Sequence, residues 1–195
     1  MTIRQRILKL FYPILMKLTA PVARKSIRLH KDPPNPPAEI YNLHVEDVTG
    51  NNIPLAQAKG KNLLLVNTAS DCGYTAQYAS LEELRARYPH QLLIIGFPSN
   101  EFKEQEKADD ESILQFCRVN YGVHFPLSKK SNVLKGDGQH PVYRWLTSKG
   151  LNGWNDKAPE WNFSKYLLDE KGRLLAYFGP QVDPLSKEIC QLIEQ

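Results

Sequence analysis

The sequence contains little cysteine: Cys72, Cys117 and Cys190 are the only three in 195 residues. Cysteines so few and so far apart exclude a disulfide framework of the kind that stabilises small secreted domains. No Cys-x-x-Cys pair is present, and none of the five histidines stands at metal-ligand spacing from a cysteine, which argues against a structural zinc site. We therefore expect a protein of a reducing compartment, the cytoplasm, in which one thiol can be reactive.

Acidic residues are absent from residues 1–31. The same segment carries eight basic residues: Arg4, Arg6, Lys9, Lys17, Arg24, Lys25, Arg28 and Lys31. The rest of the chain has 17 basic and 21 acidic residues and is mildly acidic. A nucleic-acid-binding domain would spread its basic residues over the folded surface, so this distribution excludes a nucleic-acid partner.

Long hydrophobic runs are also absent near the N-terminus. The longest uncharged run there, Leu10 to Met16, is interrupted by Pro13 and is far shorter than the roughly 20 apolar residues of a membrane-spanning helix. Three interpretations remain: a basic amphipathic helix on an anionic membrane surface or a partner, a solvated leader packed loosely on the domain, or a targeting segment. The proline-rich stretch Asp32 to Pro37 predicts an extended linker. We expect residues 1–37 to form this leader and linker, and residues 38–195 to form one folded domain.

The order of elements after the linker predicts an α/β fold. Two apolar runs, 62–69 and 91–97, have the continuous pattern of buried central strands. Further strands are expected as a hairpin around the turn 49–52 and as a second hairpin formed by 163–168 and 173–178. Helices are expected after residue 72 to about 88, and over 109–121, 141–149 and 184–194. Strand–helix–strand–helix followed by an antiparallel hairpin and a helix is typical of the thioredoxin-like fold, with a central mixed sheet flanked by helices and an N-terminal β-hairpin.

Cys72 lies between the first buried strand and the helix that follows it. Unpaired backbone N–H groups and the helix dipole at such a place stabilise a thiolate and lower the pKa of the thiol. Gly73 lets another molecule approach the backbone, and Thr75 can cap the helix. Because Thr75 stands where a dithiol exchanger would have its second cysteine, the first oxidation product of Cys72 is expected to be a sulfenic acid.

Three segments resemble the motifs of one known family, in the same order. Residues 66–78, Val-Asn-Thr-Ala-Ser-Asp-Cys-Gly-Tyr-Thr-Ala-Gln-Tyr, resemble the active-site signature of the glutathione peroxidases. Residues 96–102 with Gln105 and Glu106 resemble the second motif, and 161–168 with Gly172 resemble the third. The resemblance extends over residues 41–195 and leaves the first 37 residues outside.

The resemblance implies a catalytic tetrad made of Cys72, Gln105, Trp161 and Asn162. Amide and indole N–H groups can donate hydrogen bonds to a thiolate and to the hydroxide that leaves when the O–O bond breaks. Members of the family that use cysteine commonly have a resolving cysteine, and the segment 115–123 resembles the one that carries it, which assigns that role to Cys117. From its apolar helical surroundings alone, Cys117 would be assigned to the core, so a resolving role requires part of its helix to unwind.

The sequence therefore predicts a monomeric thiol peroxidase for hydrogen peroxide and organic or lipid hydroperoxides, with no cofactor and no metal. Thioredoxin, or glutathione, is the expected reductant of a Cys72–Cys117 disulfide. Two alternatives are a peroxide sensor that passes oxidation to a client protein and a non-enzymatic binding module. Asp71 is a departure from the family pattern, because an acid beside Cys72 opposes thiolate formation unless its side chain points to solvent.

Overall fold

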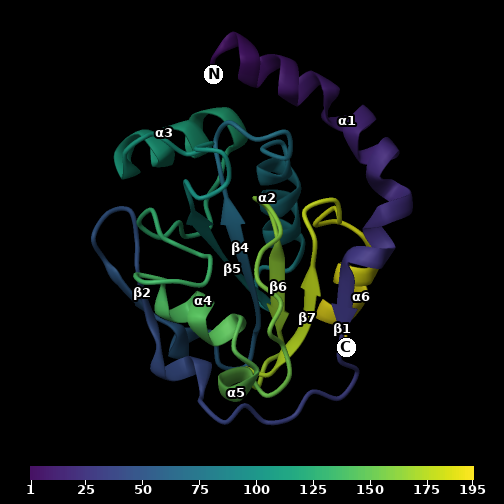
Figure 1. Cartoon of the computed structure of the whole chain (residues 1–195), viewed down its shortest axis with the longest axis vertical. Helices are drawn as coiled ribbons and strands as arrows, with labels where there is room; N and C mark the ends of the chain where they lie inside the picture. Colours follow the sequence, from purple (N-terminus) through teal and green to yellow (C-terminus); the bar gives the residue numbers. More distant parts are fainter.

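The computed structural model describes all 195 residues and has a five-stranded mixed sheet at its centre (Figure 1). The strand order is β1-β7-β6-β4-β5, in which only β4 and β5 are parallel. The strands are β1 (Ile27–Leu29), β4 (Asn62–Thr68), β5 (Leu92–Pro98), β6 (Lys165–Leu168) and β7 (Leu174–Phe178); β2 (His44–Glu46) and β3 (Asn52–Pro54) form a separate hairpin. This arrangement confirms the predicted α/β class, the mixed sheet and the N-terminal hairpin.

Strand β4, which lies between β6 and β5, contributes side chains to two hydrophobic cores on opposite faces of the sheet. Leu64 and Val66 point into the core covered by α2 (Gln77–Arg87), α3 (Asp110–Tyr121) and α6 (Lys187–Ile193). Leu63 and Leu65 point into the other core, which α4 (Pro141–Leu146) and the β2–β3 hairpin cover. Successive side chains of a strand alternate between its faces, so a strand buried on both faces is apolar throughout.

The expected helix over 141–149 is divided in two. α4 ends at Leu146 and the short α5 (Lys149–Asn152) follows, because Ser148 adopts an extended backbone conformation between them. The last helix, α6, begins at Lys187 rather than at residue 184. Strand β6 begins two residues later than expected because Phe163 has a left-handed backbone conformation (φ 66°) that a strand does not accommodate.

Residues 1–37, expected to form a leader and linker, contribute an edge strand and a long helix. Strand β1 pairs antiparallel with β7. Before it, α1 (Ile3–Ala23) curves along the outside of the domain and begins with a capping box in which Thr2 and Gln5 satisfy each other's backbone N–H groups (Figure 1). None of the helices is both long and apolar enough to span a bilayer.

Candidate active site around Cys72

Cys72 is fully buried in the loop between β4 and α2. Cys72 lies between β4 and α2 as predicted, but α2 begins only at Gln77 rather than directly after Cys72; residues 72–76 form successive turns instead. The sulfur accepts a hydrogen bond from the backbone N–H of Tyr74 at 3.4 Å. A turn, rather than a helix N-terminus, therefore supplies the backbone donor that faces the thiol.

Thr75 shapes this loop instead of capping the helix. Its hydroxyl accepts a hydrogen bond from the backbone N–H of Cys72 (3.0 Å) and donates to the carbonyl of Ala69 (2.9 Å). The N-cap residue of α2 is Ala76, which has no capping side chain. Thr75, which stands where a dithiol exchanger has its second cysteine, thus links the backbone of Cys72 to the end of β4 by hydrogen bonds.

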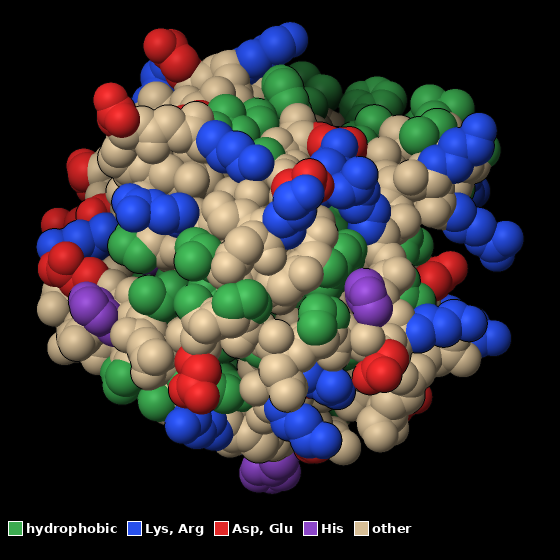
Figure 2. All heavy atoms as spheres, turned by 60° about the horizontal axis from the view of Figure 1, so that its bottom comes forward, with side chains coloured by type: hydrophobic (Ala, Val, Ile, Leu, Met, Phe, Trp, Pro, Cys, Tyr) green, Lys and Arg blue, Asp and Glu red, His purple; other side chains and the backbone are tan.

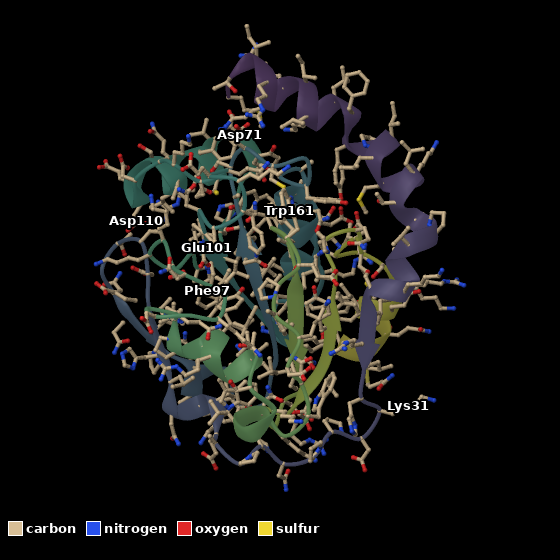
Figure 3. The ribbon with its side chains drawn as sticks, in the orientation of Figure 1. Lys31, Asp71, Phe97, Glu101, Asp110 and Trp161 are labelled. Atoms are coloured by element: carbon tan, nitrogen blue, oxygen red, sulfur yellow. The ribbon has the colours of Figure 1, made fainter.

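The structure brings Gln105, Trp161 and Asn162 together with Cys72. The side-chain amide of Asn162 donates to Gln105 Oε1 at 3.0 Å, and the carbonyl of Gln105 accepts from the backbone N–H of Asp71 at 3.1 Å. Asn162 is buried, and its Oδ1 has no hydrogen-bond partner within the protein. Figure 3 shows Trp161 at the same end of the molecule as Asp71, the neighbour of Cys72. The four residues that the family resemblance selected from distant parts of the chain form one cluster.

Burial sets the protonation state of Cys72. It raises the pKa of the thiol above its ordinary value and outweighs the hydrogen-bond donors of Tyr74, Trp161 and Asn162, which lower it. The nearby charge of Asp71 raises the pKa further. The expectation of a lowered pKa is therefore wrong for the resting structure, because desolvation of the thiolate outweighs the donors around it.

Asp71 forms an ion pair with α1. Arg4 Nη1 lies 2.9 Å from Asp71 Oδ2, and the side chain of Gln5 donates to the carbonyl of Ser70 at 3.1 Å. In Figure 3 Asp71 lies below the N-terminal part of α1. The acid beside Cys72 is thus balanced by a cation from outside the family's motifs. The absence of acids in residues 1–31 was the one sequence signal for this contact, and it did not indicate the target.

Buried polar contacts fix the segment that carries Trp161 and Asn162. The carbonyl of Trp161 accepts from the Asn67 side chain at 3.0 Å, and the N–H of Phe163 donates to the Asn67 carbonyl at 2.6 Å. The fully buried ammonium of Lys165 donates to the carbonyls of Phe163 (2.8 Å) and Val182 (2.7 Å). The segment is therefore attached to β4 on one side and to the loop after β7 on the other.

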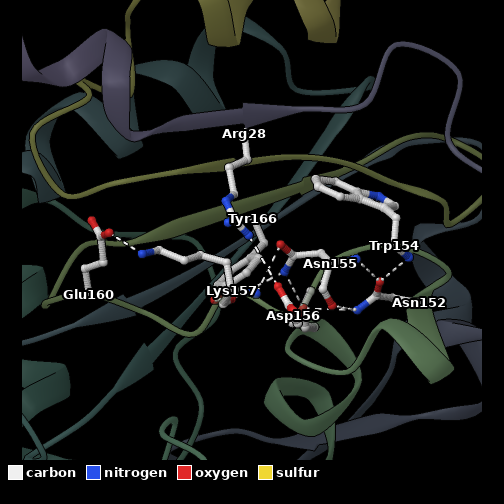
Figure 4. Close-up of polar contacts among 9 residues, drawn as sticks. Arg28, Asn152, Trp154, Asn155, Asp156, Lys157, Glu160 and Tyr166 are labelled. Atoms are coloured by element: carbon white, nitrogen blue, oxygen red, sulfur yellow. Dashed lines mark hydrogen bonds and ion pairs between the residues drawn. The ribbon is translucent and has the colours of Figure 1, made fainter.

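A second polar network holds the chain that leads into Trp161 (Figure 4). Asn152 Oδ1 accepts from the N–H groups of Trp154 and Asn155, and the hydroxyl of Tyr166 donates to the carbonyl of Lys157 at 2.7 Å. Lys157 also forms an ion pair with Glu160, and Arg28 of β1 reaches Asp156 at 3.3 Å. These contacts order an irregular segment that has no regular secondary structure of its own.

The loop before Gln105 is strained. Lys103 and Glu104 both adopt left-handed backbone conformations (φ 51° and 52°), which favour glycine. The Lys103 ammonium lies 5.7 Å from the centre of the Trp161 ring, within cation–π range. The strained backbone therefore lies in the loop that carries Gln105 and that contacts Trp161 through Lys103.

Replacing Glu104 by glycine is expected to stabilise the protein. The change Glu104→Gly relieves the left-handed strain, so the free energy of unfolding should rise by about 1 kcal/mol and Tm by roughly 2–4 °C. The lost ion pair with Lys107 is largely exposed and should contribute little. Thermal unfolding followed by circular dichroism measures the change. The matched variant Glu111→Gly, in the first turn of α3, should instead lower Tm, and a lower Tm for Glu104→Gly would contradict the prediction.

Cys117 lies buried on α3, in the same hydrophobic core as Cys72, and both are free thiols. Burial raises the pKa of Cys117 to about 12, and the charge of nearby Glu106 contributes to the increase. Cys190 is half-buried against Leu185 and lies outside the cluster, as expected for a cysteine packed on the core. Bringing Cys117 to Cys72 thus requires a local change in α3.

Comparison with known proteins agrees with the motifs. A sequence model of the glutathione peroxidase family matches residues 40–147. The glutathione peroxidase-like peroxiredoxin HYR1 of Saccharomyces cerevisiae is 42% identical over 81% of this chain and 98% of its own length. The glutathione peroxidase homolog BsaA of Bacillus subtilis is 39% identical over 80% of this chain and 99% of its own.

Solved structures show the same fold. The apo form of Trgpx has a TM-score of 0.60 and 34% identity, over 82% of this chain and 97% of its own. A DsbF homologue from Corynebacterium diphtheriae reaches a TM-score of 0.61 at 14% identity, over 87% of this chain and 92% of its own. At this low identity, the similarity to the DsbF homologue shows only that the two proteins share the thioredoxin-like fold.

Proposed function

Because this chain belongs to the glutathione peroxidase family and is a peroxidase of that kind, we propose that it reduces hydrogen peroxide and organic or lipid hydroperoxides with Cys72 as the nucleophile. The observation that carries the proposal is the cluster itself: a buried thiol whose surroundings supply the donors of Tyr74, Trp161 and Asn162. Such donors stabilise both the thiolate and the developing negative charge on the peroxide oxygen.

The first step oxidises Cys72 and reduces the peroxide. The thiolate sulfur attacks the terminal oxygen, the O–O bond breaks, and the electron pair leaves with the second oxygen as hydroxide or alkoxide, which takes up a proton. Water or an alcohol is released, and Cys72 becomes a sulfenic acid. Asn162 holds Gln105 in place through the 3.0 Å hydrogen bond between their side chains.

The second step uses Cys117 as the resolving residue. Its thiolate attacks the Cys72 sulfur, a disulfide forms and the sulfenic oxygen leaves as water. A thioredoxin-type dithiol, or glutathione, then reduces the disulfide and becomes oxidised itself. Because Cys117 is buried on α3, the helix must open locally. Helix α3 ends at Tyr121, four residues after Cys117, and Gly122 caps it in a left-handed conformation, so the segment that has to open is its last turn.

The variant Cys117→Ser tests the two-cysteine cycle. We expect it to lose thioredoxin-linked turnover by at least about tenfold, because no disulfide can form, while it still consumes one equivalent of peroxide in the absence of reductant. NADPH-coupled turnover with the thioredoxin and glutathione systems measures the first quantity, and peroxide consumed per protein measures the second. Full thioredoxin-linked activity in Cys117→Ser would disprove the resolving role. Cys190→Ser serves as the matched control and should behave as wild type.

A peroxide sensor that oxidises a client protein is the second candidate, and the deep burial of the resolving thiol favours it. A buried Cys117 leaves the Cys72 sulfenic acid without a partner until α3 opens, which gives a client thiol time to react. A sensor would turn over slowly with thioredoxin, and Cys117→Ser would trap client proteins as mixed disulfides. Fast turnover with no trapped client would exclude it.

We further propose a monomer in a reducing compartment such as the cytoplasm, with residues 1–31 in contact with a membrane surface. The three free thiols support the compartment. The segment 146–160 supports the monomer because it is short and is held to the end of α4 by Asn152 and Asn155, whereas a long insertion at this place is associated with tetrameric relatives. Eight basic and no acidic residues support the membrane contact.

A further inference from the structure

Helix α1 has one face on the active-site loops. Gln5 donates to the Ser70 carbonyl, Arg4 pairs with Asp71, and Leu15 packs on Gly73, where an added Cβ would lie 3.4 Å from Leu15 Cδ2. Further along, the Tyr12 hydroxyl donates to Asp183 at 3.0 Å. The inward face of α1 therefore covers the loop on both sides of Cys72.

The same helix contacts the element that carries Cys117. The Lys9 ammonium donates to the carbonyl of Asn120 at 3.3 Å and lies 4.6 Å from the centre of the Tyr121 ring. Both residues belong to the last turn of α3. Helix α1 thus spans the peroxidatic loop and the end of the helix that carries the resolving cysteine.

The opposite face of α1 is apolar and exposed. Of the nine large apolar side chains that are exposed in the whole chain, seven lie on α1. Six of them repeat every three or four residues and form one stripe: Ile3, Ile7, Leu10, Ile14, Leu18 and Val22. Phe11 lies beside it. Hydrophobic side chains gather at the upper right edge of Figure 2, the edge along which α1 runs in Figure 1, next to Lys and Arg side chains.

The charges beside this stripe are of one sign. Arg6 and Lys17 are exposed on the helix, Arg24 and Lys25 follow at its end, and there is no acid up to residue 31. A continuous apolar stripe along a whole helix, flanked by cations, matches a flat anionic surface rather than a single protein pocket. At 21 residues α1 is about 30 Å long, and it is not apolar enough to cross a bilayer, so it would lie parallel to the surface.

A hollow beside Gln105, one of the four tetrad residues, opens under the start of this helix. It has a volume of about 380 Å³ and is lined by Thr2, Arg4 and Gln5 of the N-terminal segment and by Asp71, Gln105 and Glu106 of the active-site loops. A surface that holds the outer face of α1 therefore lies close to this hollow and to Gln105 at its edge.

We propose that α1 docks the protein on an anionic lipid bilayer through its outward stripe, while its inward face lies on the Cys72 loop and the last turn of α3, so that the hollow beside Gln105 lies next to the membrane surface. This docking deepens the membrane contact proposed above for residues 1–31, and it is independent of catalysis. Its consequence, preferential access to hydroperoxides within the bilayer, rests on the proposed function.

Vesicle binding by the full-length protein tests the docking. We expect wild type to sediment with vesicles that contain phosphatidylglycerol and to stay in solution with phosphatidylcholine vesicles, with binding that weakens as salt rises. The double variant Leu10→Glu/Leu18→Glu should lower the partition coefficient at least tenfold, whereas Leu29→Glu, at an exposed apolar side chain of β1, should leave it unchanged. Wild type that stays in solution, or a double variant that binds as well as wild type, would overturn the proposal.

Two further measurements separate the docking from the peroxidase chemistry. Cys72→Ser should bind vesicles as wild type does, and the double variant should reduce hydrogen peroxide in solution at the wild-type rate. On a phospholipid hydroperoxide within anionic vesicles, the double variant should be at least tenfold slower than wild type. Equal rates of wild type and double variant on this substrate would overturn the proposed orientation. If light scattering shows that wild type self-associates and the double variant does not, the stripe is covered by a second copy of the chain instead of by lipid, which would overturn the docking.

Discussion

Replacing Cys72 by serine is expected to remove peroxidase activity down to the uncatalysed background, a loss of at least about 1,000-fold. Peroxide reduction needs a thiolate that accepts oxygen and becomes a sulfenic acid, and an alcohol does neither. The serine hydroxyl is similar in size and can accept the hydrogen bond that Tyr74 N–H now donates to sulfur, so the fold should be retained. Peroxide consumption and trapping of a sulfenic acid by dimedone, read by mass spectrometry, measure the two effects.

Cys190→Ser is the control for this experiment. Cys190 is half-buried near Leu185 and makes no contact with the tetrad, so both readouts should match wild type. More than a tenth of wild-type activity in Cys72→Ser would show that another residue carries the reaction.

The pH dependence of the wild-type rate follows from the same site. Burial raises the pKa of Cys72, so most of the resting enzyme holds a thiol at neutral pH and the thiolate fraction grows as pH rises. Peroxide consumption should therefore increase between about pH 7 and pH 9. A rate that is constant over this range would mean that the donors of Trp161 and Asn162 outweigh burial in the working enzyme.

Local sequence patterns predicted most of the helices and strands. They could not predict contacts between segments that are distant in the chain. The apolar runs that became β4 and β5 were readable because both faces of each strand are buried. Strand β1 was not predicted, because the three residues Ile27 to Leu29 alternate over too short a run to indicate a strand; they pair with β7 near the other end of the chain. A three-residue edge strand depends on its partner rather than on its own sequence.

The sequence motifs predicted which residues form the candidate active site, but not the protonation state of the Cys72 thiol. The motifs located Cys72 and its neighbours, because these residue types recur in one order. The pKa of Cys72 depends on how completely the rest of the chain excludes water, which no short motif encodes. The partner of Asp71 was equally hidden, because Arg4 reaches it only once α1 is folded across the domain.

Replacing Glu106 by glutamine is expected to stabilise the protein at neutral and alkaline pH. Glu106 is 1% exposed, and burial raises its pKa to about 7, from an ordinary value of 4.5, despite the hydrogen bond that Ser70 donates to it at 3.0 Å. As pH rises from about 4.5 to 7, the unfolded chain loses the proton first, so the folded state binds more protons and stability falls. Each pH unit of that window costs about 1.4 kcal/mol, so the total is about 3 kcal/mol.

Glutamine keeps the size of the side chain and the hydrogen bond from Ser70 but cannot ionise. Glu106→Gln should therefore unfold at about the same urea concentration as wild type near pH 4.5 and be about 3 kcal/mol more stable at pH 8. The control Glu111→Gln, at an exposed position of α3, should change stability by less than about 0.5 kcal/mol at either pH. A difference between Glu106→Gln and wild type that does not grow with pH would show that Glu106 ionises normally. In that case its charge would be solvated beside Cys117, and the core around the resolving thiol would be more open to water than its packing indicates.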